Sequence, residues 1–314
     1  MNKSKFSKPI VFVPLAMLCC FLWGSAFPTV KTGYALFNIG ADDSFSQILF
    51  AGVRFALAGI LVFVIGCLMS KKLLLPKNKT QIGHIAVLGL FQTVLQYIMF
   101  YIGLAHTSGV KSSILVAVNV FMSLIISALV FKMEKLTFQK TAGVVLGFAG
   151  VVIINLTSAS SLGGFSIKGE GAILLSAFAY SVSSVLIKKY SQTDNPVMLS
   201  GWQFFAGGLF MIIFGLIAGG KFIVEPSETA KSLLILFYLA FISAVAYTVW
   251  GILLKYNPVS NVAVMGFMNP VFGVLLSAAI LGETAEAFSF KNLISLLLVC
   301  VGIFIVNKDF RKKA

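Results

Sequence analysis

Charged side chains are scarce in this sequence. Only 11% of its 314 residues are Asp, Glu, Lys or Arg, whereas a soluble domain carries about 25%. The hydrophobic share is 59%, and the mean hydropathy is +0.99. A core of ordinary size cannot hide that much apolar surface from water, so the composition argues against a soluble globular domain and indicates a chain that spans a lipid bilayer.

Cysteine is also rare, and the positions of the cysteines suggest no disulfide framework. The four cysteines are Cys19, Cys20, Cys67 and Cys300. All of them fall in apolar stretches, and no Cys-x-x-Cys spacing occurs. We therefore expect packed thiols, with no disulfide network, no metal site and no cofactor.

Ten stretches are apolar and long enough to cross a membrane, which takes roughly 20 residues each. The sequence therefore predicts an all-α membrane protein with ten transmembrane helices joined by short loops. The expected spans are 10–31, 46–69, 82–104, 111–131, 138–156, 169–188, 197–218, 232–254, 261–281 and 290–306.

Lysine placement predicts the orientation. The net charge of +14 could suggest nucleic acid in a soluble protein, but here the lysines form short runs between apolar stretches. If the N-terminus is cytoplasmic, the inner segments hold 17 Lys and Arg residues and the outer ones six. Basic residues concentrate on the cytoplasmic side of membrane proteins. We therefore expect both termini in the cytoplasm, a bilayer as the surrounding partner, and no nucleic acid.

The two halves of the chain align with each other. A shift of 149 residues places Tyr101 on Trp250, and a shift of 157 places Trp23 on Tyr180 and Lys31 on Lys188. The order of such matches is kept along each half, which indicates a duplication with repeats at 1–157 and 158–314. Because five spans is an odd number, the second repeat enters the membrane inverted. Inverted repeats are the architecture of many secondary transporters, which expose a central site to each side in turn.

Local motifs add a family resemblance that covers essentially the whole chain. The segments that carry it are Trp23-Gly24-Ser25-Ala26-Phe27-Pro28, Arg54-Phe55-Ala56-Leu57-Ala58-Gly59, Asn269-Pro270 and Leu281-Gly282-Glu283. In this order they resemble the EamA family of the drug/metabolite transporter superfamily.

The resemblance implies ten helices and export of amino acids, their relatives or other small metabolites, with no particular substrate. The first half departs from the pattern, because Phe121 stands where the second half has Pro270. It also has Lys132-Met133-Glu134 where the second half has Leu-Gly-Glu.

Arg54 is the only arginine within an expected span. A cation in hydrocarbon needs a partner or a water-filled cavity. Arg54 is therefore either a cavity group that meets a carboxylate or other anion, or a side chain that reaches the interface or binds helix carbonyls. Both interpretations stay open from the sequence.

Other candidates for the cavity are amides and aromatic residues. The amides Asn119, Asn269, Gln92, Gln96 and Gln203 lie within spans and could bond a zwitterion or join helices. Among the aromatics, Trp23, Tyr180 and Trp250 are favoured, because the repeat places an aromatic at each equivalent position; the competing interpretation is ordinary packing. Pro28 and Pro270 interrupt backbone bonding and are candidate hinges or static bends. Glu134 and Glu283 end two equivalent spans and are expected to pair with lysines or to hold a loop.

No Asp or Glu falls deep inside a span. Carriers driven by protons usually place a carboxylate there. We therefore expect transport that is not coupled to protons through a buried carboxylate.

Other functional classes fit less well. An enzyme is not expected, since no His-Glu-x-x-His and no paired intramembrane aspartates occur. A channel is also less favoured, because an inverted repeat within one chain fits a carrier better than it fits a pore on a rotational axis. A carrier of nucleotide sugars or phosphorylated sugars is the main alternative, but phosphate calls for several cations at depth. The expectation is thus a plasma-membrane carrier of a small-molecule substrate. The oligomeric state stays open, and a monomer is compatible with the sequence.

Overall fold

The computed structural model describes residues 5–133, 135–156, 165–284 and 289–307. The described chain is helical, with no strand in these ranges. Eight of its helical segments are long and apolar enough to cross a membrane, and α7 and α14 are the two other long helices. The predicted all-α membrane fold with ten spans is confirmed.

The ten spans follow the predicted order, and four of them are divided into shorter helical pieces. Two short 3-10 turns precede α1 and α10, at Lys5–Ser7 (η1) and Pro226–Glu228 (η6). The spans are α1 (Pro9–Leu36), α2 (Ser44–Ser70), α3 with the π-helical η2 and α4 (Lys79–Leu88, Gly89–Leu95, Gln96–Ala105), α5 with α6 and the π-helical η3 (Gly109–Val116, Val118–Ile125, Ile126–Val130), α7 (Phe138–Leu156), the π-helical η5 with α8 (Ile167–Gly171, Ala172–Tyr190), α9 (Pro196–Ile217), α10 (Thr229–Tyr256), α11 with α12 (Val259–Met265, Met268–Leu281) and α14 (Phe290–Asn307).

Polar residues in the short loops start the helices. Asp43 caps α2, Asn78 caps α3 and Ser108 caps α5, each through a side-chain oxygen that accepts a backbone N–H of the first turn. Asn195 caps α9 in the same way, and Pro196 follows it at the first helical position. These caps satisfy N–H groups that would otherwise lack partners at helix ends.

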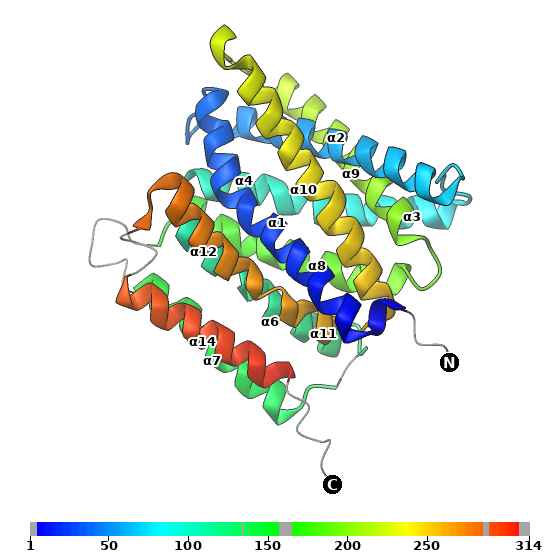
Figure 1. Ribbon diagram of the computed structural model, residues 1–314, viewed down its shortest axis with the longest axis vertical. Coiled ribbons are helices and arrows are strands. Elements are labelled where there is room, and N and C mark those ends of the chain that lie inside the picture. The colour runs from blue at the N-terminus through cyan, green and yellow to red at the C-terminus, as the bar shows by residue number, and fades with distance from the viewer. Residues whose placement is uncertain (1–4, 134, 157–164, 285–288, 308–314) are drawn as a thin grey trace.

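Contacts between spans follow a two-fold pattern. In Figure 1, α1 runs between α10 and α12, and α1 packs against both. The equivalent helix of the second half, α8, packs against α4 and α6. Three further close pairs join equivalent spans, namely α2 with α9, α7 with α14 and α5 with α12. The two halves are therefore intertwined, and the core of the molecule lies between them.

The fourth and ninth spans break at equivalent positions. The α5–α6 break is at Ala117, where Val120 N donates to Ala117 O at 3.2 Å. The α11–α12 break is at Gly266, 149 residues later, where Asn269 N donates to Gly266 O at 3.2 Å. Pro270 follows only the second break, so a proline cannot be the common cause of the two breaks.

Glycines let some helices approach closely. A Cβ on Gly302 of α14 would lie 2.5 Å from the carbonyl oxygen of Gly143 on α7. A Cβ on Gly208 of α9 would lie 2.3 Å from the amide nitrogen of Ala56 on α2. Small residues at such crossings are typical of helix packing in membranes.

Candidate functional site

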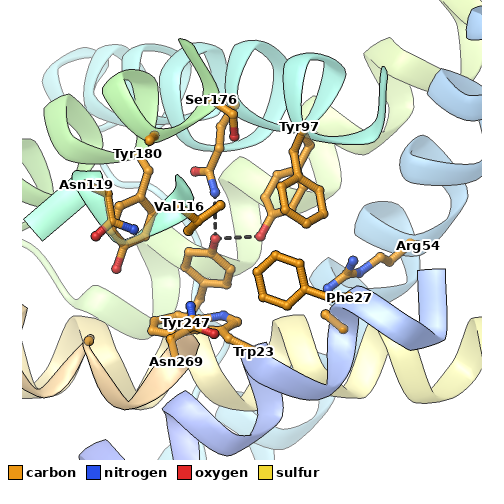
Figure 2. A pocket seen from close by; sticks show the side chains of 15 residues that line it. Trp23, Phe27, Arg54, Tyr97, Val116, Asn119, Ser176, Tyr180, Tyr247 and Asn269 are labelled. Atoms are coloured by element: carbon orange, nitrogen blue, oxygen red, sulfur yellow. Dashed lines mark hydrogen bonds between the residues drawn. The ribbon is translucent and has the colours of Figure 1, made fainter. Parts of the chain in front are cut away.

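A pocket lies between the two halves, and seven spans contribute to its wall. It holds about 600 Å³ of space free of atoms, part of it continuous with the exterior. The lining residues are Trp23, Ala26, Phe27, Arg54, Gln96, Tyr97, Phe100, Val116, Asn119, Ser176, Ala177, Tyr180, Tyr247, Gly266 and Asn269. Figure 2 shows Arg54 at one side of the pocket and Asn119 and Tyr180 at the other.

Aromatic rings form much of the wall. Trp23 on α1 meets Tyr247 and Trp250 of α10 edge to face, with centroid distances of 5.0 and 4.9 Å. Tyr180 on α8 meets the same indole at 6.2 Å. Edge-to-face contacts are a preferred geometry for aromatic pairs. The wall is therefore built from both halves of the chain.

Hydroxyl and amide groups in the aromatic wall form hydrogen bonds between the two halves. The hydroxyls of Tyr97 and Tyr247 lie 2.5 Å apart, and Gln96 Nε2 donates to the Tyr247 hydroxyl at 2.9 Å, as the dashed lines in Figure 2 show. These bonds hold α4 of the first half against α10 of the second. They also fix the orientation of the Gln96 amide, because its nitrogen donates to the Tyr247 hydroxyl.

Arg54 is 1% exposed and is held by α10 and α4. Its Nε donates to Leu239 O and to Ser243 Oγ, each at 3.0 Å, and its Nη1 donates to the Tyr101 hydroxyl at 2.9 Å. The guanidinium also lies 5.0 Å from the ring centroid of Phe55 and 5.6 Å from that of Tyr97. Among the described residues, no hydrogen bond uses Nη2.

The pocket wall is electropositive. Arg54 is the one charged residue among the described side chains that line it, and none of those side chains is acidic. Neutral dipoles and aromatic faces stabilise the guanidinium but leave its charge uncompensated. A negatively charged group that enters the pocket is thus attracted to Arg54.

Three buried polar atoms in this wall have no hydrogen-bond partner among the described residues: Trp23 Nε1, Gln96 Oε1 and Asn269 Oδ1. These side chains belong to residues that are 8%, 6% and 8% exposed. Leaving such a group without a partner costs about 1–3 kcal/mol. A polar ligand that enters the pocket can supply partners for these atoms.

Of the residues singled out from the sequence, Trp23, Arg54, Gln96, Asn119, Tyr180 and Asn269 all line this pocket. Trp250 lines a small adjoining pocket, which shares Asn119 and Tyr180 with the first. Gln203 Nε2 donates to Gln92 Oε1, so these two amides join α9 to η2 and do not line the pocket. Glu283 pairs with Lys31, and Glu134 lies outside the described residues.

The two prolines differ in their surroundings. Pro28 lies inside α1, which continues through it as one helix from Pro9 to Leu36, and its carbonyl accepts a hydrogen bond from Thr32 Oγ1 at 3.0 Å. Pro270 lies in the first turn of α12, directly after the break at Gly266.

Sequence reasoning did not single out Phe27 or Ser176. Both had a signal, because each lies four residues from a predicted pocket residue on the same helix. Phe27 follows Trp23 by one turn, and Ser176 precedes Tyr180 by one turn. Residues four apart share a helix face.

Comparisons with known proteins agree with this architecture. The EamA-like transporter family matches residues 11–156 and 167–308. An uncharacterized transporter of Archaeoglobus fulgidus is 29% identical over 90% of this chain and 82% of its own length. A probable amino-acid metabolite efflux pump of Salmonella typhimurium is 28% identical over 95% of both chains. One crystal structure superposes with a TM-score of 0.69 over 96% of this chain and 98% of its own, at 17% identity, which supports the fold alone.

Proposed function

Because the chain belongs to the EamA-like transporter family, we propose that it exports small organic solutes that carry a carboxylate, namely amino acids and related metabolites. The observation that carries the proposal is Arg54, a buried cation in a pocket wall without an acidic side chain among its described residues. A single carboxylate neutralises such a site. The name of the Salmonella relative supports the same substrate class.

The transport mechanism is alternating access between two inverted repeats, 1–157 and 158–314. The two-fold pattern of helix contacts supports this division, because each half contributes one wall of the pocket. The equivalent breaks at Ala117 and Gly266 divide two pocket-lining spans, and the second break supports a hinge near Pro270. The proposed hinge at Pro28 rests on the residue type alone.

In this proposal the substrate contacts Arg54, Trp23, Gln96, Asn119, Tyr180 and Asn269. Trp250 supports the indole of Trp23. The Gln92–Gln203 pair serves to hold two helices together. The protein lies in the plasma membrane with both termini in the cytoplasm, as the distribution of lysines favours.

A carrier of phosphorylated or nucleotide sugars receives less support. A phosphate group binds best where several cationic groups or bidentate arginines meet it. Among the described lining residues only Arg54 is cationic. One guanidinium matches one carboxylate better than it matches a phosphate.

Flux from proteoliposomes tests the proposal. Liposomes are loaded with a panel of amino acids, organic cations and sugar phosphates, and release is followed for the wild type and for Arg54→Leu. We expect release of amino acids that falls at least tenfold in the variant. The matched control is Gln92→Met with Gln203→Met, which removes a buried polar pair outside the pocket and should leave flux unchanged. Release of sugar phosphates but not of amino acids would contradict the proposal.

A further inference from the structure

One end of the bundle carries two carboxylates from the second half, and each meets a lysine from the first half. Lys111 Nζ forms an ion pair with Glu170 Oε1, and Lys31 Nζ lies 3.9 Å from Glu283 Oε1. The residues come from the ends of the first, fourth, sixth and ninth spans, all of which line the pocket. In the proposed topology this is the outer end.

Glu170 is enclosed at this end. Its side chain is 5% exposed, and that of Lys111 is 13% exposed. The carboxylate also accepts the Ser166 amide at 2.9 Å and the Thr107 hydroxyl at 3.4 Å. Removing one partner of such a buried pair costs far more than removing one partner of an exposed pair, because the other charge is left without compensation away from water.

Glu283 makes a second connection nearby. Its carboxylate accepts the Gly109 amide at 3.3 Å and the Val110 amide at 3.0 Å, so it binds the first turn of α5. The Lys111–Glu170 pair and Glu283 therefore hold the start of the fourth span from two directions, both times through a side chain of the opposite half.

The two-fold relation between the halves gives the Lys111–Glu170 pair no counterpart at the opposite end. The shift of 149 residues that relates the two breaks places Lys111 on Ser260, and the shift of 157 that relates Trp23 to Tyr180 places Glu170 on Val13. Neither Ser260 nor Val13 can carry a charge. An inverted repeat with perfect symmetry would favour its two end states equally. The opposite end joins the halves by a different pair, His84 Nδ1 with Asp194 Oδ2 at 2.7 Å, so the two ends are not equivalent.

We propose that the Lys111–Glu170 pair is a latch that closes the outer end of the pocket and sets the resting state of the carrier open toward the cytoplasm. The proposal rests on the alternating-access function. The latch must come apart once in each cycle, and water then solvates both charges. Its strength therefore sets the ratio of the two end states.

The path toward the cytoplasm in this proposal runs through the small pocket that shares Asn119 and Tyr180 with the main one. Leu254 and Val259 line it and are both 2% exposed, so it is closed in this structure and must widen in the open state. These two residues lie where α10 ends and α11 begins, at the end of the bundle opposite the latch.

Accessibility of a pocket cysteine tests the latch without a substrate. Val116 lines the pocket and takes the reporter as Val116→Cys, in a background where the four native cysteines are replaced. Labelling by a membrane-impermeant maleimide is measured from each side in oriented vesicles. In Lys111→Ser with Glu170→Val, which copies the opposite end, we expect labelling from the outer side to rise at least fivefold and labelling from the inner side to fall.

Two further variants make the result decisive. The charge swap Lys111→Glu with Glu170→Lys should restore the wild-type labelling ratio if the pair acts through its charges. The control is Lys231→Ser with Glu228→Val, because Lys231 and Glu228 form an exposed ion pair within one half, at 3.0 Å; it should leave labelling unchanged. Equal labelling ratios in the wild type and in the Ser/Val variant would overturn the latch.

The outcomes separate the latch from the proposed function. A shift in labelling in a protein that releases no amino acids would keep the latch and reject the substrate class. Normal amino-acid release with no shift in labelling would keep the substrate class and reject the latch.

Discussion

The hydroxyl of Tyr101 accepts a hydrogen bond from Arg54 Nη1 at 2.9 Å, while the backbone carbonyl of the same residue accepts one from the Tyr34 hydroxyl at 2.8 Å. One residue of α4 thus fixes the guanidinium on α2 and, separately, the end of α1. The two bonds can be removed independently.

Tyr101→Phe removes only the bond to Arg54. A buried hydrogen bond to a charged group contributes about 1.5–3 kcal/mol, so we expect a lower unfolding temperature and a KM for amino-acid release that rises several-fold as the guanidinium loses its fixed orientation. Tyr34→Phe is the control: it should lower stability while leaving KM unchanged. A KM that is the same in Tyr101→Phe and in the wild type would show that Arg54 needs no help from Tyr101.

Asn269→Leu should stabilise the protein and impair transport. Its Oδ1 has no partner among the described residues, so the substitution removes a buried unsatisfied group. We expect a free energy of unfolding that is higher by about 1 kcal/mol and a release rate reduced several-fold. Asn257→Leu provides the contrast, because Asn257 Nδ2 donates to Leu253 O at 2.9 Å and to Phe6 O at 3.2 Å; this variant should be less stable than the wild type. A loss of stability in Asn269→Leu would mean that the amide is already satisfied.

Gly302→Ala should loosen the packing of α14 on α7. The new Cβ would lie 2.5 Å from Gly143 O and 2.8 Å from Gly147 N, both backbone atoms that cannot move alone. Overpacking of this kind costs about 1–3 kcal/mol. Thermal unfolding in detergent measures it, with Gly83→Ala as control, since nothing lies within 4 Å of a Cβ at Gly83. Equal unfolding temperatures for the two variants would contradict the close approach of these helices.

A pH gradient should not drive the export. No described side chain that lines the pocket is Asp or Glu, so a proton has no buried carboxylate to bind there. We expect the same rate of amino-acid release, within about twofold, with and without a gradient across the liposome membrane. Accumulation of an amino acid against its own gradient, driven by protons, would contradict this prediction.

The fold followed from the sequence because its signals are long and simple. Apolar stretches of about 20 residues can do little but cross a bilayer, and each predicted span coincides with a helical span of the structure to within a few residues. The break at Gly266 had a signal in Pro270, which follows it by four residues, whereas no proline marks the break at Ala117, which could therefore not be predicted.

The pocket was harder to predict than the fold. Helix periodicity alone does not say which face of a span meets the other half. Trp23 and Tyr180 were found because the repeat matched them, whereas the five amides looked alike in sequence. Only the packing separates Gln96, which faces the pocket, from Gln92, which is bonded to Gln203.

The hydrogen bonds of Arg54 have a consequence for the synthesis and membrane insertion of the protein. Its partners Leu239 and Ser243 follow it by 185 and 189 residues. At 5–20 residues per second, a ribosome needs roughly 10–40 seconds to make that stretch. During this interval the second span carries a cation that α10 cannot yet satisfy. The nascent first half must therefore wait with its arginine in water, against lipid headgroups or beside an insertion factor, and the pocket closes around Arg54 only when α10 arrives.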